Sequence, residues 1–129
     1  MEIAYNIDKR GRKRQKMKKQ TPEIFELQLS RLGEAHFLVL YWVLSSEDKG
    51  VKYNITNVFD DLKSAGVTRT KQTAVATVAA LELLCLVDLR EERNRKNLYL
   101  TGYGGQALKY FVEERHFEPK KSNYLENLK

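Results

Sequence analysis

The segment of residues 68–104 constrains the fold of this 129-residue chain more than any other part. Its first twenty residues, TRTKQTAVATVAALELLCLV, carry apolar side chains at successive steps of four, three and four. This periodicity predicts a helix over about residues 69–84 that buries one stripe of side chains. The stripe consists of Ala74, Val78, Leu81 and Cys85.

A charged β-hairpin is predicted directly after this helix. Apolar and charged residues alternate over 86–90, and leucines alternate with Tyr99 over 98–100, as in two half-buried strands joined by a turn at 92–96. The tip carries side chains suited to contact phosphates or a minor groove. They are Arg93, Asn94, Arg95 and Lys96. Charge at a hairpin tip is also favoured by solvation alone, so both interpretations stay open.

A shorter helix is predicted before the long one, over about residues 57–65. Thr56 is expected to cap its N-terminus, and Gly66 suits the left-handed position just past its C-terminus. Asp60 and Asp61 lie near the positive end of the helix, where carboxylates are stabilised. With Thr68 capping the next helix, the order is helix, turn, helix. The residues before it, 51–55, have strand character.

The outward face of the long helix is suited to reading DNA. Its side chains are small or hydrogen-bonding, which lets a helix approach a groove floor and contact base edges. The candidate residues are Arg69, Thr70, Lys71, Gln72, Thr73 and Ala76, followed on the same side by Ala79 and Ala80. Alanine is also the best helix former, and such a face packs equally well against another helix.

LELLCLVDLR, a basic turn and LYLTGYG together resemble the signature of winged-helix regulators, the MarR-like and PadR-like group in particular. The resemblance covers about residues 34–115. It implies a mainly α fold with a small β-hairpin wing, a winged helix-turn-helix with N- and C-terminal helices for dimerisation. It further implies that Leu81, Leu86, Val87 and Leu100 are core and that Thr101 opens the following helix.

Two features depart from that group. Cys85 replaces the usual glycine after the long helix, so the backbone there need not be left-handed, and the thiol is expected to be a small core group. The second departure is a basic arm, residues 1–20, expected to be disordered until it meets a polyanion. Its cations are Lys9, Arg10, Arg12, Lys13, Arg14, Lys16, Lys18 and Lys19. From Gln20 onward 15 basic and 15 acidic residues balance, so the folded part is formally neutral.

Two apolar helices are predicted between the arm and the helix-turn-helix. The first begins at Thr21 with Pro22 at its first position and runs to about Leu32, and the second covers about residues 34–46. A last helix starts near Gly104 and ends by Pro119. The resemblance implies dimerisation through the first and last helices. The candidate interface residues are Ile24, Phe25, Leu29, Leu32, Leu108, Phe111 and Val112. Alternatively, the first helix closes over its own domain. The domain therefore covers residues 21–117, and residues 118–129 form a loose tail.

Several functional classes find no support in the sequence. One cysteine and two histidines cannot form a structural zinc site, and no paired carboxylates, phosphate loop or nucleophile with a base indicate an enzyme or a cofactor. The longest apolar run, residues 37–44, is far below the ~20 residues of a membrane span. We therefore expect a cytoplasmic protein with no membrane partner; a small-molecule effector is compatible with the sequence but not indicated by it.

Three functions are compatible with this pattern. The favoured one is a dimeric, sequence-specific protein that binds double-stranded DNA, such as a transcriptional repressor. The second gives the same DNA binding to plasmid or phage replication or segregation. In the third, the winged helix is a protein-interaction module and the basic arm grips RNA. The neutral folded part favours the third, because DNA readers usually present a basic face beyond a tail.

Overall fold

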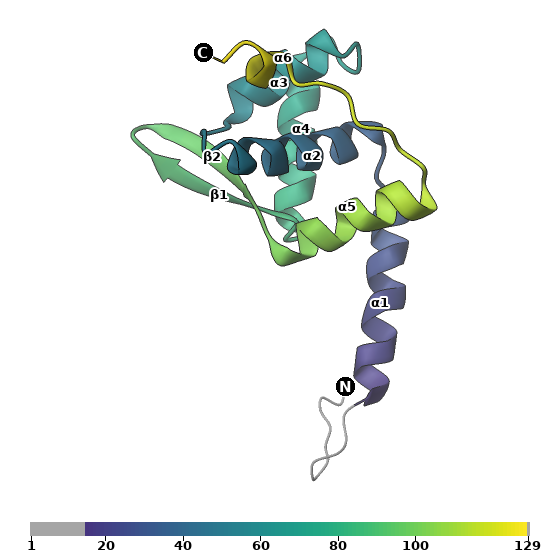
Figure 1. Ribbon diagram of the computed structural model, residues 1–129. Helices are drawn as coiled ribbons and strands as arrows, with labels where there is room; N and C mark the ends of the chain where they lie inside the picture. Colours follow the sequence, from purple (N-terminus) through teal and green to yellow (C-terminus); the bar gives the residue numbers. More distant parts are fainter. Residues whose placement is uncertain (1–14, 129) are drawn as a thin grey trace. The chain divides into compact units, whose positions relative to one another are not determined.

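A computed structural model describes residues 15–128 of the chain. These residues form six helices and one two-stranded antiparallel sheet (Figure 1). In chain order the elements are α1 Gln15–Ser30, α2 Glu34–Asp48, α3 Ile55–Ser64, α4 Lys71–Leu83, β1 Val87–Glu92, β2 Arg95–Leu100, α5 Gly102–Glu114 and α6 Asn123–Glu126. The described residues divide into two compact units, 15–31 and 32–128, which we describe separately. No helix within the described residues has the length and apolar content to cross a membrane.

The first unit contains α1, which starts earlier than predicted. The helix begins at Gln15, six residues before the expected start at Thr21, and it ends at Ser30 rather than Leu32. The backbone of residues 15–20 is therefore helical, which corrects the assignment of these residues to a disordered arm. Glutamine, lysine and methionine are good helix formers, and nothing in this stretch stops the helix. The remaining residues of the predicted arm, 1–14, lie outside the described part.

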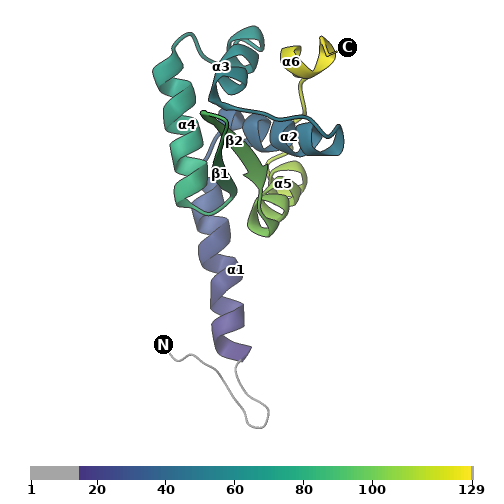
Figure 2. The same ribbon diagram turned by 90° about the vertical axis from the view of Figure 1, so that its left-hand side faces the viewer.

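The second unit is built around α2, which starts at Glu34 as predicted. Seven of its side chains are buried, including Phe37, Trp42 and Val43. They are covered by α3, α4, α5 and β2 of the same unit. The buried side chains of this helix are therefore covered by its own unit. Figure 2 shows α2 crossing between the other elements.

The turn between α3 and α4 has the predicted geometry with different caps. Gly66 is left-handed at φ 76°, and the amide of Val67 donates to the Leu62 carbonyl at 2.9 Å, which closes the C-terminus of α3. The cap of α3 is not Thr56: Asn54 begins the helix two residues earlier and shares a reciprocal capping box with Asn57.

The N-terminus of α4 also differs from the prediction. Its cap is Thr70 rather than Thr68, and the Thr70 hydroxyl accepts from the Thr73 amide at 3.2 Å. Thr68 is buried and accepts a hydrogen bond from the Thr70 amide instead. Arg69 consequently lies in the loop before α4 and not within it.

The hairpin is antiparallel, with Val87 opposite Leu100 and Glu92 opposite Arg95. Arg93 and Asn94 form its two-residue turn with positive φ values of 54° and 66°, the geometry of a type I′ turn. The hairpin projects from the helices (Figure 1). Residues 51–53 form no regular strand, although the Leu98 amide donates to the Tyr53 carbonyl at 2.8 Å.

Two expectations about Cys85 are wrong. Its backbone is left-handed at φ 63°, so the junction between α4 and the hairpin requires this conformation even without a glycine. Its side chain is exposed rather than part of the core. The Cys85 carbonyl accepts a hydrogen bond from the Thr101 hydroxyl at 2.6 Å, which ties the junction to the start of α5.

Thr101 caps α5 as the resemblance implies, accepting from the Gly104 amide at 3.0 Å. The helix ends at Glu114, five residues before Pro119, so the proline does not end it. Leu108 and Phe111 are buried within the unit, where the Phe111 ring lies 6.1 Å from that of Phe37.

The C-terminal residues are not a loose tail, because a buried carboxyl group holds them. Asp61 is fully buried and accepts hydrogen bonds from the Tyr53 hydroxyl at 2.5 Å, the Ser122 hydroxyl and the Tyr124 amide at 2.9 Å. The Trp42 indole donates to the Lys120 carbonyl at 2.7 Å. The three hydrogen-bond donors to Asp61, and not a position near a helix end, explain why its carboxyl group can be buried.

We predict that Asp61→Ala destabilises the fold by about 2–4 kcal/mol, because it leaves buried donors without an acceptor. Asp60→Ala is the matched control, since that neighbouring side chain is exposed. Urea unfolding followed by tryptophan fluorescence measures both. Equal effects of the two substitutions would show that the tail contacts contribute nothing to stability.

Gly104 and Gly105 offer a second matched pair. A Cβ at Gly104 would collide with the Leu86 carbonyl and lie 2.6 Å from Cδ1 of Leu100, whereas one at Gly105 meets nothing within 4 Å. Gly104→Ala should therefore cost about 1–3 kcal/mol of unfolding free energy. Gly105→Ala should be neutral or slightly stabilising, because alanine favours the helix. Thermal melts of both variants test the difference, and a harmless Gly104→Ala would refute this packing.

Candidate nucleic-acid interface

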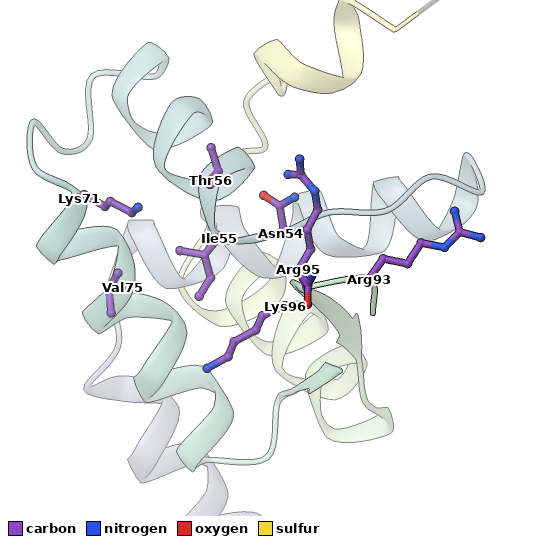
Figure 3. A pocket seen from close by; sticks show the side chains of 9 residues that line it. Asn54, Ile55, Thr56, Lys71, Val75, Arg93, Arg95 and Lys96 are labelled. Carbon is purple, nitrogen blue, oxygen red and sulfur yellow. The ribbon is translucent and has the colours of Figure 1, made fainter. Parts of the chain in front are cut away.

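A cleft of about 620 Å³ separates the hairpin tip from the N-terminal ends of α3 and α4. Figure 3 shows its lining seen from close by. The residues that line it are Asn54, Ile55, Thr56, Lys71, Val75, Arg93, Asn94, Arg95 and Lys96. Three segments far apart in the sequence thus meet at one surface, and each contributes groups that can donate hydrogen bonds.

The charged residues lining this cleft are all basic. Lys71 comes from the first turn of α4, and Arg93, Arg95 and Lys96 come from the hairpin. In Figure 3 the Lys71 and Lys96 side chains point into the space between α4 and the hairpin, while Arg93 points away from it. All four side chains are exposed and accessible to a polyanion. This arrangement can hold phosphate groups through charge-assisted hydrogen bonds.

The structure brings only some of the predicted DNA-reading residues to this cleft. Lys71 joins the four hairpin residues there, while Gln72, Thr73 and Ala76 are exposed on α4 without lining it. Arg69 and Thr70 precede the helix, where the Thr70 hydroxyl is engaged as its cap.

Sequence reasoning missed four lining residues, which are Asn54, Ile55, Thr56 and Val75. The first three were missed because the cap of α3 was predicted at Thr56 rather than at Asn54. The N-x-x-N spacing of Asn54 and Asn57 was nevertheless a visible capping signal. Val75 is 43% exposed and lies beside the predicted reading face. The sequence pattern does not indicate that Val75 lines a cleft, because an apolar residue at that position fits a buried core equally well.

Glu92, the acid directly before the hairpin turn, is held by partners on the strand face that carries Asn97 and Tyr99. Glu92 accepts hydrogen bonds from the Asn97 amide at 2.7 Å and the Tyr99 hydroxyl at 2.6 Å. Its carboxylate also lies 3.4 Å from the Lys52 ammonium. These contacts, the Tyr99 hydrogen bond first, lower the pKa of Glu92 to about 2. Glu92 therefore stays ionised and is neutralised locally by Lys52.

The predicted dimer positions fall into two groups. Leu32, Leu108 and Phe111 are buried within the second unit, so they are not available as an interface. Ile24 is 57% exposed and Val112 is 48% exposed. Phe25 is half-buried and Leu29 is buried.

Of the arm cations, Lys9, Arg10, Arg12, Lys13 and Arg14 lie outside the described residues, and Lys16, Lys18 and Lys19 fall within α1.

The two histidines and the cysteine have no shared site. His36 accepts a hydrogen bond from the Gly33 amide at 3.0 Å, and burial lowers its pKa. His116 follows α5 in a left-handed conformation. In the part of the chain that the structure describes, no three His, Cys, Asp or Glu side chains gather where they would hold a metal ion.

Comparison with known proteins does not identify a family. No family model, curated protein or solved structure matches this chain. The resemblance to winged-helix regulators therefore remains a prediction, which depends on the order of α3, α4 and the hairpin.

The pKa of Glu92 generates a test of the hairpin contacts. Because the folded pKa is depressed, this group stabilises the fold above its ordinary value of 4.5, and the contribution is lost as the pH falls towards 2. Tyr99→Phe removes the largest cause, so it should raise the pKa of Glu92 towards 4.5. Carboxyl chemical shifts followed by NMR between these pH values measure it in both proteins. An unchanged midpoint in Tyr99→Phe would contradict the assigned contact.

Proposed function

We propose that this protein binds double-stranded DNA as a dimeric transcriptional regulator. In this proposal α3 and α4 are a helix-turn-helix, the first turns of α4 enter the major groove, and the hairpin is a wing on the phosphate backbone. The observation that carries the proposal is the cleft between α4 and the hairpin tip, whose four charged lining residues are Lys71, Arg93, Arg95 and Lys96.

The exposed face of α4 supports base reading. Gln72, Thr73 and Ala76 are exposed, while Ala74, Thr77 and Val78 anchor the opposite side in the core. Glutamine can pair with an adenine edge, and alanine or threonine methyl groups can contact thymine. A helix with small side chains on its outer face can also approach the groove floor closely. The rigid anchoring of α4 fixes which residues face outward.

The local distribution of charge explains how a folded part with no net charge can still bind DNA. Although 15 basic and 15 acidic residues balance from Gln20 onward, at least two of the acids are engaged by other groups of the fold. Asp61 is buried in its hydrogen-bond network, and Glu92 is paired with Lys52 beside the turn. The lining of the cleft contains no acid. The charged lining of the cleft is therefore basic although the folded part is formally neutral, which favours DNA over the protein-interaction alternative.

Dimerisation in this proposal uses the exposed apolar side chains of α1. Ile24 and Leu27 are each 57% exposed and lie three residues apart, on one side of the helix. A two-fold symmetric dimer of such a protein predicts a pseudo-palindromic DNA site whose half-sites lie about one helical turn apart.

Selection from a pool of random duplexes, followed by sequencing, tests the function and identifies the site. On the selected site, Lys71→Ala and Lys96→Ala should each reduce the slope of log K against log salt by about one, since each removes a phosphate contact. Gln72→Ala should cost about 1–3 kcal/mol on that site and little on random DNA. Lys109→Ala, an exposed cation on α5 that does not line the cleft, is the matched control.

Two results would contradict the proposal. If no sequence is enriched, the chain does not read DNA bases. If Lys109→Ala lowers the salt slope as much as Lys71→Ala and Lys96→Ala do, the binding is a general charge effect and not a property of this cleft.

A further inference from the structure

The exposed face of α4 carries no polar side chain between its first turn and Glu82. The residues exposed there are Val75, Ala76 and Ala79. Val75 is the largest of them, is 43% exposed and lines the basic cleft. It follows Lys71 by four residues, so the two side chains lie on the same side of the helix. The cleft therefore places an aliphatic group directly beside a cation.

The hydroxyl groups of α4 leave little hydrogen-bonding capacity for a base edge. The Thr73 hydroxyl lies 2.9 Å from the hydroxyl of Thr70, which caps the helix. Thr77 is buried, and its hydroxyl donates to the Thr73 carbonyl at 2.8 Å. Gln72 is the only exposed amide of the helix. Beyond Gln72, this face can therefore contact a base edge mainly through methyl groups.

The floor of the major groove offers one apolar substituent to such a face, the C5 methyl group of thymine. The other groups that distinguish base pairs there are hydrogen-bond donors and acceptors. A valine side chain placed against one of these would remove it from water without replacing its hydrogen bond, which costs affinity. An aliphatic face thus selects a methyl group by contact and disfavours polar base edges by desolvation.

We infer that α4 recognises the C5 methyl groups of pyrimidines and that Val75 determines this specificity. The inference rests on the proposed function and names the DNA sequences it requires, which carry thymines where the duplex meets Val75, Ala76 and Ala79. The exposed face beside Val75 has no side chain that could distinguish the O4 acceptor of thymine from the N4 amine of cytosine. A 5-methylcytosine therefore takes the place of such a thymine, and binding responds to cytosine methylation.

Charge decides between DNA and an apolar protein surface as the partner of this face. The Lys71 and Lys96 side chains point into the space that Val75 also lines (Figure 3). A protein helix that covered Val75 with apolar side chains would leave these cations against an apolar surface, which is costly. A duplex supplies phosphates to the two lysines and methyl groups to Val75 in one approach.

Replacement of single thymines in the selected duplex by 2′-deoxyuridine tests the inference, because it removes only the methyl group. Fluorescence anisotropy of labelled duplexes with the full chain measures the dissociation constants. We expect the replacement to weaken binding by about three- to ten-fold at one or more thymines of each half-site, the effect of one buried methyl group. At the same positions, 5-methyl-2′-deoxycytidine should bind more tightly than 2′-deoxycytidine by a similar factor.

Val75→Ala should remove most of the difference between thymine and deoxyuridine and leave binding to the deoxyuridine duplex nearly unchanged. Val112→Ala is the matched control, because Val112 is 48% exposed, lies on α5 and does not line the cleft. In that variant the difference between the two duplexes should persist. Both valines are exposed, so neither substitution removes a core side chain.

The outcomes separate this inference from the proposed function. A selected site without thymines, a site at which no thymine methyl group matters, or a difference that Val75→Ala leaves intact overturns the inference alone. If no sequence is enriched from the random pool, the inference and the proposed function both fail. The exposed face of α4 would then point to a protein partner.

Discussion

The buried carboxyl group of Asp61 is the interaction on which the arrangement of the second unit most depends. It joins three segments, because its partners are Tyr53 before α3, Ser122 before α6 and the backbone of Tyr124. Burial raises the pKa of Tyr53, so the hydroxyl stays protonated and keeps donating to this carboxyl. A buried polar group with all its partners in place fixes one geometry, since every alternative leaves a group unpaired.

That geometry reaches the cleft proposed to bind DNA. Asn54 follows Tyr53 directly, caps α3 and lines this cleft. The hairpin is tied to the same unit by the Leu100 amide, which donates to Glu47 on α2 at 2.6 Å. The surface proposed to contact DNA is therefore supported by polar contacts made well away from it.

The sequence predicted elements better than it predicted the partners of individual residues. It gave the positions of α2, α4, the hairpin and the cap of α5, because apolar periodicity and turn residues act over a few neighbouring positions. It placed the caps of α3 and α4 two residues away from Asn54 and Thr70. In both cases several neighbouring polar residues can cap the helix, and the local sequence does not show which of them does.

The candidate site was predictable in part for the same reason. The hairpin tip and Lys71 follow from the local pattern, whereas Asn54 and Thr56 reach the cleft only because α3 packs beside α4. Three predictions were wrong because each depends on contacts between distant segments. They are the buried thiol of Cys85, the dimer role of Leu108 and Phe111, and the loose C-terminal tail.

The sequence by itself therefore determined the order of helices and hairpin and the basic character of the hairpin tip. Only the tertiary structure decided that Asp61 is a buried acceptor rather than a helix-end charge, and that Glu92 is paired beside the turn. It also decided that the folded part, formally neutral from Gln20 onward, presents a cleft whose charged lining is wholly basic. The physical reason is that periodicity and capping are local, while burial and charge pairing are set by residues that meet only when the chain is folded.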